Sequence, residues 1–181
     1  MRFQFDIALT EEDYLAFNYF HHIESADGRK QVQIRRVLFL FFMAIMVALV
    51  IIIRGWTVYT TIYTVLMTLF AFVYFLCFNK SAKRSLKAQI EKLSKSGNLP
   101  FDPISKMEFY EDHLVDISAK MRIELSYEGI KRMCVVANRY IFLYDGIASA
   151  YILPLSQIKE QVNPDDFLRF LLLKSKTIEN Y

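Results

Sequence analysis

Glycine is scarce in this chain of 181 residues, with five copies spread between Gly28 and Gly146. A loop that cradles phosphate through its backbone N–H groups needs several glycines within a few positions of one another. No stretch of the sequence meets that condition, and no serine stands in a recognisable nucleophile elbow. The sequence therefore favours a binding role over catalysis, and we expect no cofactor.

Cysteine and histidine are also few. Cys77 and Cys134 fall in an apolar run and in a predicted strand, and neither their number nor their spacing indicates a disulfide or a metal site. The adjacent residues His21 and His22 point about 100° apart on a helix, so they cannot hold one ion together. His113 follows two acidic residues in what we interpret as a solvated turn. We expect no metal.

Charge is nearly absent from residues 37–78, where Arg54 stands alone. Two apolar runs flank it, residues 37–53 and 57–78, and a membrane span needs about 20 residues at about 1.5 Å each. The second run meets this length, and the first is near the lower limit. Because a soluble domain rarely holds so long a stretch with one charge, the pattern predicts a transmembrane hairpin of two helices that turns at residues 54–56.

Basic residues gather on both sides of the predicted hairpin and set its orientation. Lys and Arg near a span are retained in the cytoplasm, and the turn carries only Arg54. We therefore predict a multi-pass protein of the cell membrane with both termini in the cytoplasm. The flanking basic residues are Arg29, Lys30, Arg35 and Arg36 before the hairpin, and Lys80, Lys83, Arg84 and Lys87 after it.

Residues 79–100 are predicted to form a basic helix followed by a linker. Gly97 is placed to end the helix, and Pro100 and Pro103 favour a linker over residues 97–103. Such a basic cluster beside a span favours anionic lipid headgroups over nucleic acid, because acidic residues outnumber basic ones beyond it. The candidate headgroup contacts are Lys80, Lys83, Arg84, Lys87 and Lys92.

Small and hydroxylated residues recur on one face of each predicted span. Such faces permit close helix packing, and the threonine hydroxyls can return their hydrogen bonds to the backbone. A conducting path commonly shows an internal acid or base, which neither span has. Packing is therefore favoured, while a small oligomeric transport or pore subunit stays open as the alternative function. The packing candidates are Ala44, Ala48, Thr57, Thr61, Thr64 and Thr68.

Residues 1–36 are predicted to form a strand and an amphipathic helix in the cytoplasm. Apolar residues alternate from Phe3 to Ile7, with the period of a half-buried strand. Thr10 is placed to cap the helix, and Asp13 could close a capping-box-like arrangement with it. We expect the aromatic side of this helix to be buried against the membrane surface or against the later domain.

Residues 101–181 are predicted to form an α+β domain. Met121 to Tyr127 alternates strictly between apolar and polar residues, and further runs of strand length follow. Pro164 and the acidic residues after it mark the start of a final helix capped by Asn163. The pattern predicts an antiparallel sheet or half-open barrel closed by that helix. The further strand runs are 134–137, 140–144 and 148–153, with turns predicted at Asn138–Arg139 and Asp145–Gly146.

The order of these elements resembles the bacterial YcxB-like family. The resemblance is carried by residues 9–14, with Phe17 and His21, by the hairpin, and by the runs 140–144 and 150–154. It implies a two-pass protein of the bacterial cell membrane whose cytoplasmic carboxy-terminal domain has a pleckstrin-homology-like (PH-like) fold. The family supplies no activity and no catalytic residues to carry over. The expected function is binding of a protein, a peptide or the lipid surface by this domain.

Overall fold

The computed structural model describes residues 1–97, 99, 101–146, 149–174 and 178–181. These residues form two compact units. The sheet-rich unit consists of Met1–Phe17 and Ile90–Tyr181, and the helical unit is Asn18–Gln89. Two long apolar helices and a separate region with eight strands are therefore present, as the sequence predicts in outline.

Helix α1 (Glu11–Tyr19) leads from the first strand into the helical unit. Its start has the predicted capping arrangement, because Asp13 N donates to Thr10 Oγ1 at 3.2 Å and Thr10 N donates to Asp13 Oδ2 at 2.9 Å. A π-helical turn, Phe20–Glu24, follows. Buried Ser25 then caps helix α2 (Ala26–Arg54) by accepting from Gly28 N at 3.0 Å.

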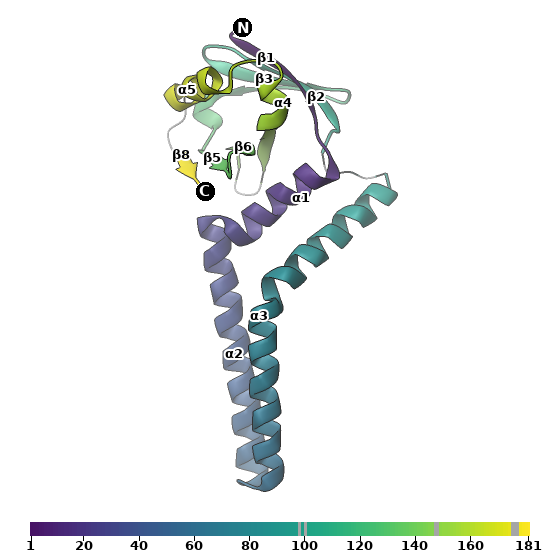
Figure 1. Ribbon diagram of the computed structural model, residues 1–181, viewed down its shortest axis with the longest axis vertical. Coiled ribbons are helices and arrows are strands. Elements are labelled where there is room, and N and C mark those ends of the chain that lie inside the picture. The colour runs from purple at the N-terminus through teal and green to yellow at the C-terminus, as the bar shows by residue number, and fades with distance from the viewer. Residues whose placement is uncertain (98, 100, 147–148, 175–177) are drawn as a thin grey trace. The chain divides into compact units, whose positions relative to one another are not determined.

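Helices α2 and α3 (Val58–Lys95) are longer than the two predicted spans and contain them, apart from Thr57 just before α3. Within the helical unit, α3 begins beside α2 and diverges from it farther along (Figure 1). Gly55 (φ 69°) ends α2 and Gly97 (φ 71°) follows α3, both in the left-handed region where glycine is favoured. Part of the predicted linker, including Pro100, lies outside the described residues.

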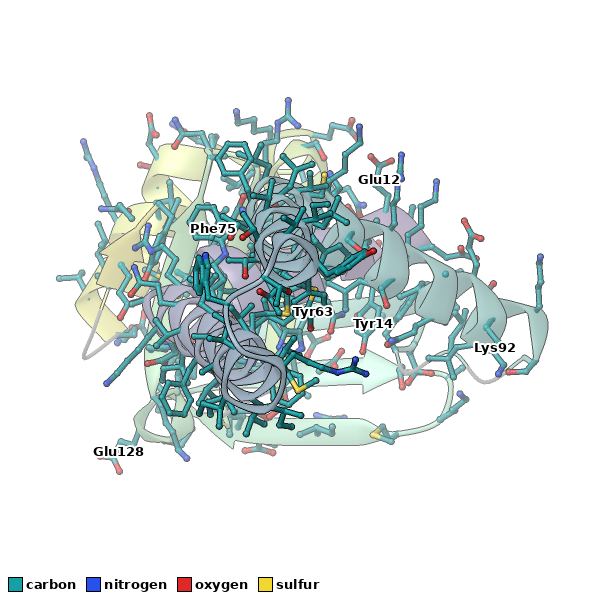
Figure 2. All side chains as sticks on the ribbon, turned by 90° about the horizontal axis from the view of Figure 1, so that it is seen from below. Glu12, Tyr14, Tyr63, Phe75, Lys92 and Glu128 are labelled. Atoms are coloured by element: carbon teal, nitrogen blue, oxygen red, sulfur yellow. The ribbon has the colours of Figure 1, made fainter. Side chains whose placement is uncertain are left out.

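The apolar side chains of α2 and α3 are mostly exposed. Only 6% of the most apolar 18-residue stretch of each helix is buried, whereas a core helix of a soluble protein would be mostly buried. Figure 2 looks along the helices and shows side chains projecting around both of them. By length and composition, both helices could cross a membrane.

The sheet-rich unit contains two four-stranded sheets. The first has the order β1-β2-β3-β4 and is antiparallel throughout, and the second has the order β7-β6-β5-β8, with β8 parallel to β5. The elements are β1 (Phe3–Ala8), β2 (Ile104–Phe109), β3 (His113–Ser118), β4 (Arg122–Ser126), β5 (Arg132–Val136), β6 (Tyr140–Tyr144), β7 (Ala150–Pro154), α4 (Leu155–Lys159), α5 (Pro164–Lys174) and β8 (Ile178–Asn180), with a 3₁₀ turn at Tyr127–Gly129.

Strand β1 belongs to the same sheet as the carboxy-terminal strands, although the sequence pattern places residues 1–36 and 101–181 in separate segments. It pairs with β2 over its whole length, from Phe3 opposite Phe109 to Ala8 opposite Ile104. The side chains of Gln157 and Gln161 cover the other edge of β1. They exchange hydrogen bonds with the backbone of Ala8 and Asp6 at 2.8–3.2 Å. In chain order, the helical unit is therefore an insertion between two neighbouring strands.

An aromatic cluster joins β1 to the rest of the core. The Phe167 ring on α5 lies 4.7 Å from that of Phe5 and 4.9 Å from that of Phe109, and all three side chains are fully buried. Phe3 adds ring contacts to Phe167 and Phe170 at 5.3 Å. The final helix closes the sheets as predicted, and its cap is confirmed because Asp165 N donates to Asn163 Oδ1 at 3.0 Å.

Three details of the second sheet differ from the expected pattern. The β5–β6 turn is centred on Ala137 and Asn138, which both have positive φ (49° and 52°), one position earlier than predicted. Tyr144 pairs with Ala150, so the β6–β7 connection is longer than a two-residue hairpin at Asp145–Gly146, and Ala148 lies outside the described residues. Strand β8 was not predicted, because three residues are too few to show a period.

Candidate functional site

A cavity of about 340 Å³ lies in the sheet-rich unit and combines aromatic walls with carboxylates. Tyr14 comes from α1 and its ring lies 5.0 Å from that of Phe101, which precedes β2. Asp116 of β3 lines the cavity from the first sheet, and Asp145 and Tyr151 line it from the β6–β7 region. These residues come from four distant segments of the chain, so no local motif marks the site.

The pleat of the first sheet turns Asp116 toward this cavity. Leu114 lies in the buried core, and Asp116, two residues along β3, shares its face. On the paired strand, Ser105 likewise shares the face of buried Met107 and hydrogen-bonds to Asp116. In the sequence, the site could have been found only from a carboxylate at a strand position that faces the core. Local alternation of apolar and polar residues does not distinguish such a carboxylate from one that faces solvent.

Asp116 and Asp145 line the cavity, and one carboxylate oxygen of each, Oδ1, is buried without a hydrogen-bond partner among the described residues. Burial raises the pKa of Asp116, and the nearby Asp102 adds to this rise while the Ser105 hydrogen bond opposes it. Burial raises the pKa of Tyr151 to about 12, and the negative charges of Asp145 and Asp116 add to this rise. An incompletely solvated carboxylate is costly unless it is paired, so the cavity favours a cation.

The third carboxylate of the cavity is already paired. Asp102 lies 3.3 Å from Lys120 Nζ. A hydrogen bond from Ser118, and then the interaction with Lys120, lower the pKa of Asp102 below its usual value. The unmet negative charge is therefore concentrated at Asp116 and Asp145.

A second cavity, of about 470 Å³, lies in the helical unit between the start of α2 and the middle of α3. Its lining includes the aromatic residues Tyr74 and Phe78 and the polar residues Ser81, Ser85 and Arg35. It thus combines apolar and polar groups close to the residues where the predicted hairpin begins and ends. We call it the interfacial groove.

Two positively charged groups near the interfacial groove differ in how they are held. Arg36 is engaged, because its Nη2 donates to Asn79 Oδ1 at 3.0 Å and its guanidinium lies 4.5 Å from the centre of the Phe75 ring. Arg35 lines the groove and is exposed. Burial, and then Arg35, lower the pKa of His22, so His22 is neutral at pH 7.

The predicted headgroup contacts are all exposed on α3. Lys83 also contacts an aromatic ring, because its Nζ lies 5.3 Å from the centre of the Tyr19 ring. The lining of the interfacial groove includes none of the five. The exposed residues are Lys80, Lys83, Arg84, Lys87 and Lys92.

The predicted helix-packing residues differ in their exposure. Ala44 and Ala48 are exposed, as are Thr57, Thr61 and Thr68, whereas Thr64 is half-buried. The threonine prediction was right in one respect, since Thr61, Thr64 and Thr68 return their hydroxyl hydrogen bonds to the carbonyl four residues earlier at 2.8–3.0 Å.

Two aromatic side chains stack between these helices. Phe39 stacks on Tyr74 with ring centres 4.0 Å apart, and Met43 of α2 and Thr60 of α3 are buried. Thr60 Oγ1 also accepts from Thr57 N at 2.8 Å at the start of α3, a capping role that the threonine spacing does not reveal.

The remaining sulfur and imidazole groups form no cluster in the described part of the chain. Cys77 is exposed and Cys134 is buried, and both are free thiols. His113 Nδ1 lies 2.7 Å from Asp112 Oδ1, and its ring stacks on Tyr110. Within the described residues, no group of three or more His, Cys, Asp or Glu side chains could hold a metal ion.

No family model, curated protein or solved structure matches this chain. The function proposed for it therefore rests on its own residues, on their geometry and on the resemblance drawn from its sequence.

Proposed function

We propose that this protein crosses a bacterial cell membrane twice, through α2 and α3, and holds the sheet-rich unit at the cytoplasmic face as a PH-like binding module for a basic segment of a partner protein. The insertion of the helical unit between β1 and β2 carries the two-span placement in this proposal. The chain leaves the sheet after Ala8 and returns at Ile104, which are paired, and Leu9 N donates to Pro103 O at 2.8 Å. Because Ala8 and Ile104 are paired in one sheet, both must lie on the same side of the membrane. Two spans return the chain to that side.

Three further features support the membrane placement and the fold. The apolar faces of both helices are exposed, and basic residues flank both predicted spans. Two four-stranded sheets closed by α5 are consistent with the PH-like fold that the YcxB-like resemblance implies. The exposed lysines and arginine after Phe78 would then lie next to anionic headgroups, where each contributes about 1 kcal/mol.

The acidic cavity indicates the chemistry of the partner. Asp116 and Asp145 line the cavity, and each has one buried carboxylate oxygen without a partner in the described part of the chain. A Lys or Arg side chain that binds these carboxylates would supply charged donors. The aromatic rings of Tyr14 and Phe101 give the stem of such a side chain an apolar and cation-attracting wall. A basic side chain on an extended or looped peptide fits this cavity best.

We predict that replacing these carboxylates abolishes a preference for basic peptides. The purified full chain in detergent is titrated with fluorescent peptides that carry Arg, Lys, norleucine or Glu at one central position. Wild-type protein should bind the Arg and Lys peptides most tightly. The double variant Asp116→Asn, Asp145→Asn should bind them at least about tenfold more weakly, since a hydrogen bond to a charged group contributes about 1.5–3 kcal/mol.

Asp112→Asn is the matched control, because the Asp112 side chain is 84% exposed and lies outside the cavity. It removes the same kind of charge from the same unit and should leave peptide affinity unchanged. Equal binding of the Arg and norleucine peptides by wild-type protein would contradict the proposed ligand. An equal loss of affinity in Asp112→Asn would show that the effect comes from the net charge of the protein and not from the cavity.

A further inference from the structure

We infer that the interfacial groove binds one anionic phospholipid, with the phosphate at Arg35 and an acyl chain beside Tyr74 and Phe78. This inference rests on the membrane placement proposed above but not on the acidic cavity of the sheet-rich unit. It names a specific lipid site in place of a general attraction between basic residues and the membrane surface.

The lining of the groove matches the two chemical parts of a phospholipid. The guanidinium of Arg35 can donate two parallel hydrogen bonds to phosphate oxygens, and the hydroxyls of Ser81 and Ser85 add neutral donors. Tyr74, Cys77 and Phe78 provide the apolar wall. A volume of about 470 Å³ accommodates a headgroup and the first part of one chain rather than a whole lipid.

The neighbouring cation explains why Arg35 is the phosphate ligand. Arg36 is held between Asn79 and the faces of Phe75 and Phe78, at 4.5 and 5.3 Å from the ring centres. It therefore braces α2 against α3 and is not free to follow a headgroup. Arg35 has no such brace among the described residues, and it lies beside neutral His22, so an incoming phosphate would meet one accessible charge.

The position of the groove favours a lipid over a peptide as its occupant. Tyr74 and Cys77 belong to the apolar run 57–78, whereas Ser81 and Ser85 follow it. If that run spans the bilayer, the groove crosses from hydrocarbon to headgroup level. An extended peptide would have to place unpaired backbone groups in hydrocarbon, whereas a lipid has an apolar part for one level and a polar part for the other.

Protection of Cys77 from alkylation tests this inference. Cys77 is exposed and lines the groove, whereas Cys134 is buried and monitors folding. The full chain in mild detergent is treated with N-ethylmaleimide while dioctanoyl phosphatidylglycerol, dioctanoyl phosphatidylcholine or glycerol phosphate is titrated. Phosphatidylglycerol should slow the labelling of Cys77 at concentrations about tenfold below those needed for phosphatidylcholine. The reason is that phosphatidylglycerol lacks the choline cation, which would repel Arg35. Glycerol phosphate should not protect Cys77.

Two variants and one control separate a built site from surface charge. Arg35→Gln should weaken protection by phosphatidylglycerol about tenfold, the effect of losing one charge-assisted contact. Ala82→Leu adds bulk to the lining and should weaken protection by both lipids. Lys30→Gln removes an exposed charge from the same helix outside the groove and should change nothing.

The possible failures are distinct. Equal protection by both lipids, or an unchanged response in Arg35→Gln, would overturn the phospholipid site and leave the membrane placement intact. Protection by glycerol phosphate alone would show a phosphate site that needs no lipid, which also overturns the inference. Release of the wild-type chain from cell membranes by alkaline washing would overturn both the site and the placement on which it rests.

Discussion

Residues 1–17 joined through a flexible linker to residues 90–181 are expected to form a soluble protein that melts cooperatively, whereas residues 101–181 alone are expected not to fold. A linker of about 20 Gly and Ser residues, with a root-mean-square span of about 25 Å, replaces the helical unit. This expectation follows from the pairing of β1 with β2, which places β1 in the same sheet as the strands that follow the insertion.

The shorter fragment loses too much of its core. Phe5 and Ile7 of β1 are 0% and 1% exposed, and both side chains pack in the main cluster of the unit. Truncating a buried Phe costs about 3–5 kcal/mol and a buried Ile about 2–5 kcal/mol, so their joint loss approaches the whole stability of a domain, about 5–15 kcal/mol. It also removes the strand that pairs with β2 and the backbone groups that bind Gln157 and Gln161.

Circular dichroism and thermal melting distinguish the two proteins. The linked protein should show strand signal and one sigmoidal transition, and the 101–181 fragment should show neither. A fragment 101–181 that is soluble and melts cooperatively would contradict the assignment of β1 to this sheet. It would restore the segment boundaries that the sequence suggests.

Phe167→Ala is expected to destabilise the linked protein by about 3–5 kcal/mol, the usual cost of emptying a large core position. Phe167 is fully buried and touches the rings of Phe3, Phe5 and Phe109, so its removal opens a cavity where α5 meets the first sheet. For a unit of this size, the melting temperature should fall by more than about 10 °C.

Leu173→Ala is the control on the same helix, because Leu173 is 84% exposed. It should change the free energy of unfolding by less than about 0.5 kcal/mol in urea titrations. A Phe167→Ala protein with an unchanged urea midpoint would show that α5 does not close the core. Equal effects of the two substitutions would mean that the helix is simply intolerant of alanine.

Local patterns predicted several elements of this fold. The alternation from Met121 to Tyr127, the cap at Asn163 and the apolar runs of both helices each depend on neighbouring residues, and each predicted element is present. Their pairing was harder to predict. Nothing in the alternation at Phe3–Ile7 says that its partner is β2, which follows the whole insertion.

The candidate sites depended even more on long-range geometry. Asp116 belongs to the first sheet and Asp145 follows a strand of the second, while Arg35 and Ser85 belong to different helices. The residues of neither cavity therefore recur at a spacing that could be recognised in the sequence. The small-residue rule does not point to the stacked rings of Phe39 and Tyr74, which join α2 to α3. Phe39 and Tyr74 were visible in the sequence, but their register depends on the turn at Gly55, which a period alone does not fix.

The location of the turn between α2 and α3 decides whether the chain crosses the membrane twice. Trp56 is 69% exposed in that turn, so Trp56→Cys in a Cys77→Ala background offers an accessible thiol there.

Intact cells that carry this variant are treated with a membrane-impermeant maleimide. Matched proteins with one added cysteine before Met1 or after Tyr181 are treated in the same way. We predict labelling of the turn in intact cells, and labelling of both ends only after the cells are permeabilised. Labelling of either end in intact cells, or protection of the turn until permeabilisation, would contradict a two-span insertion that returns the chain to the cytoplasmic side.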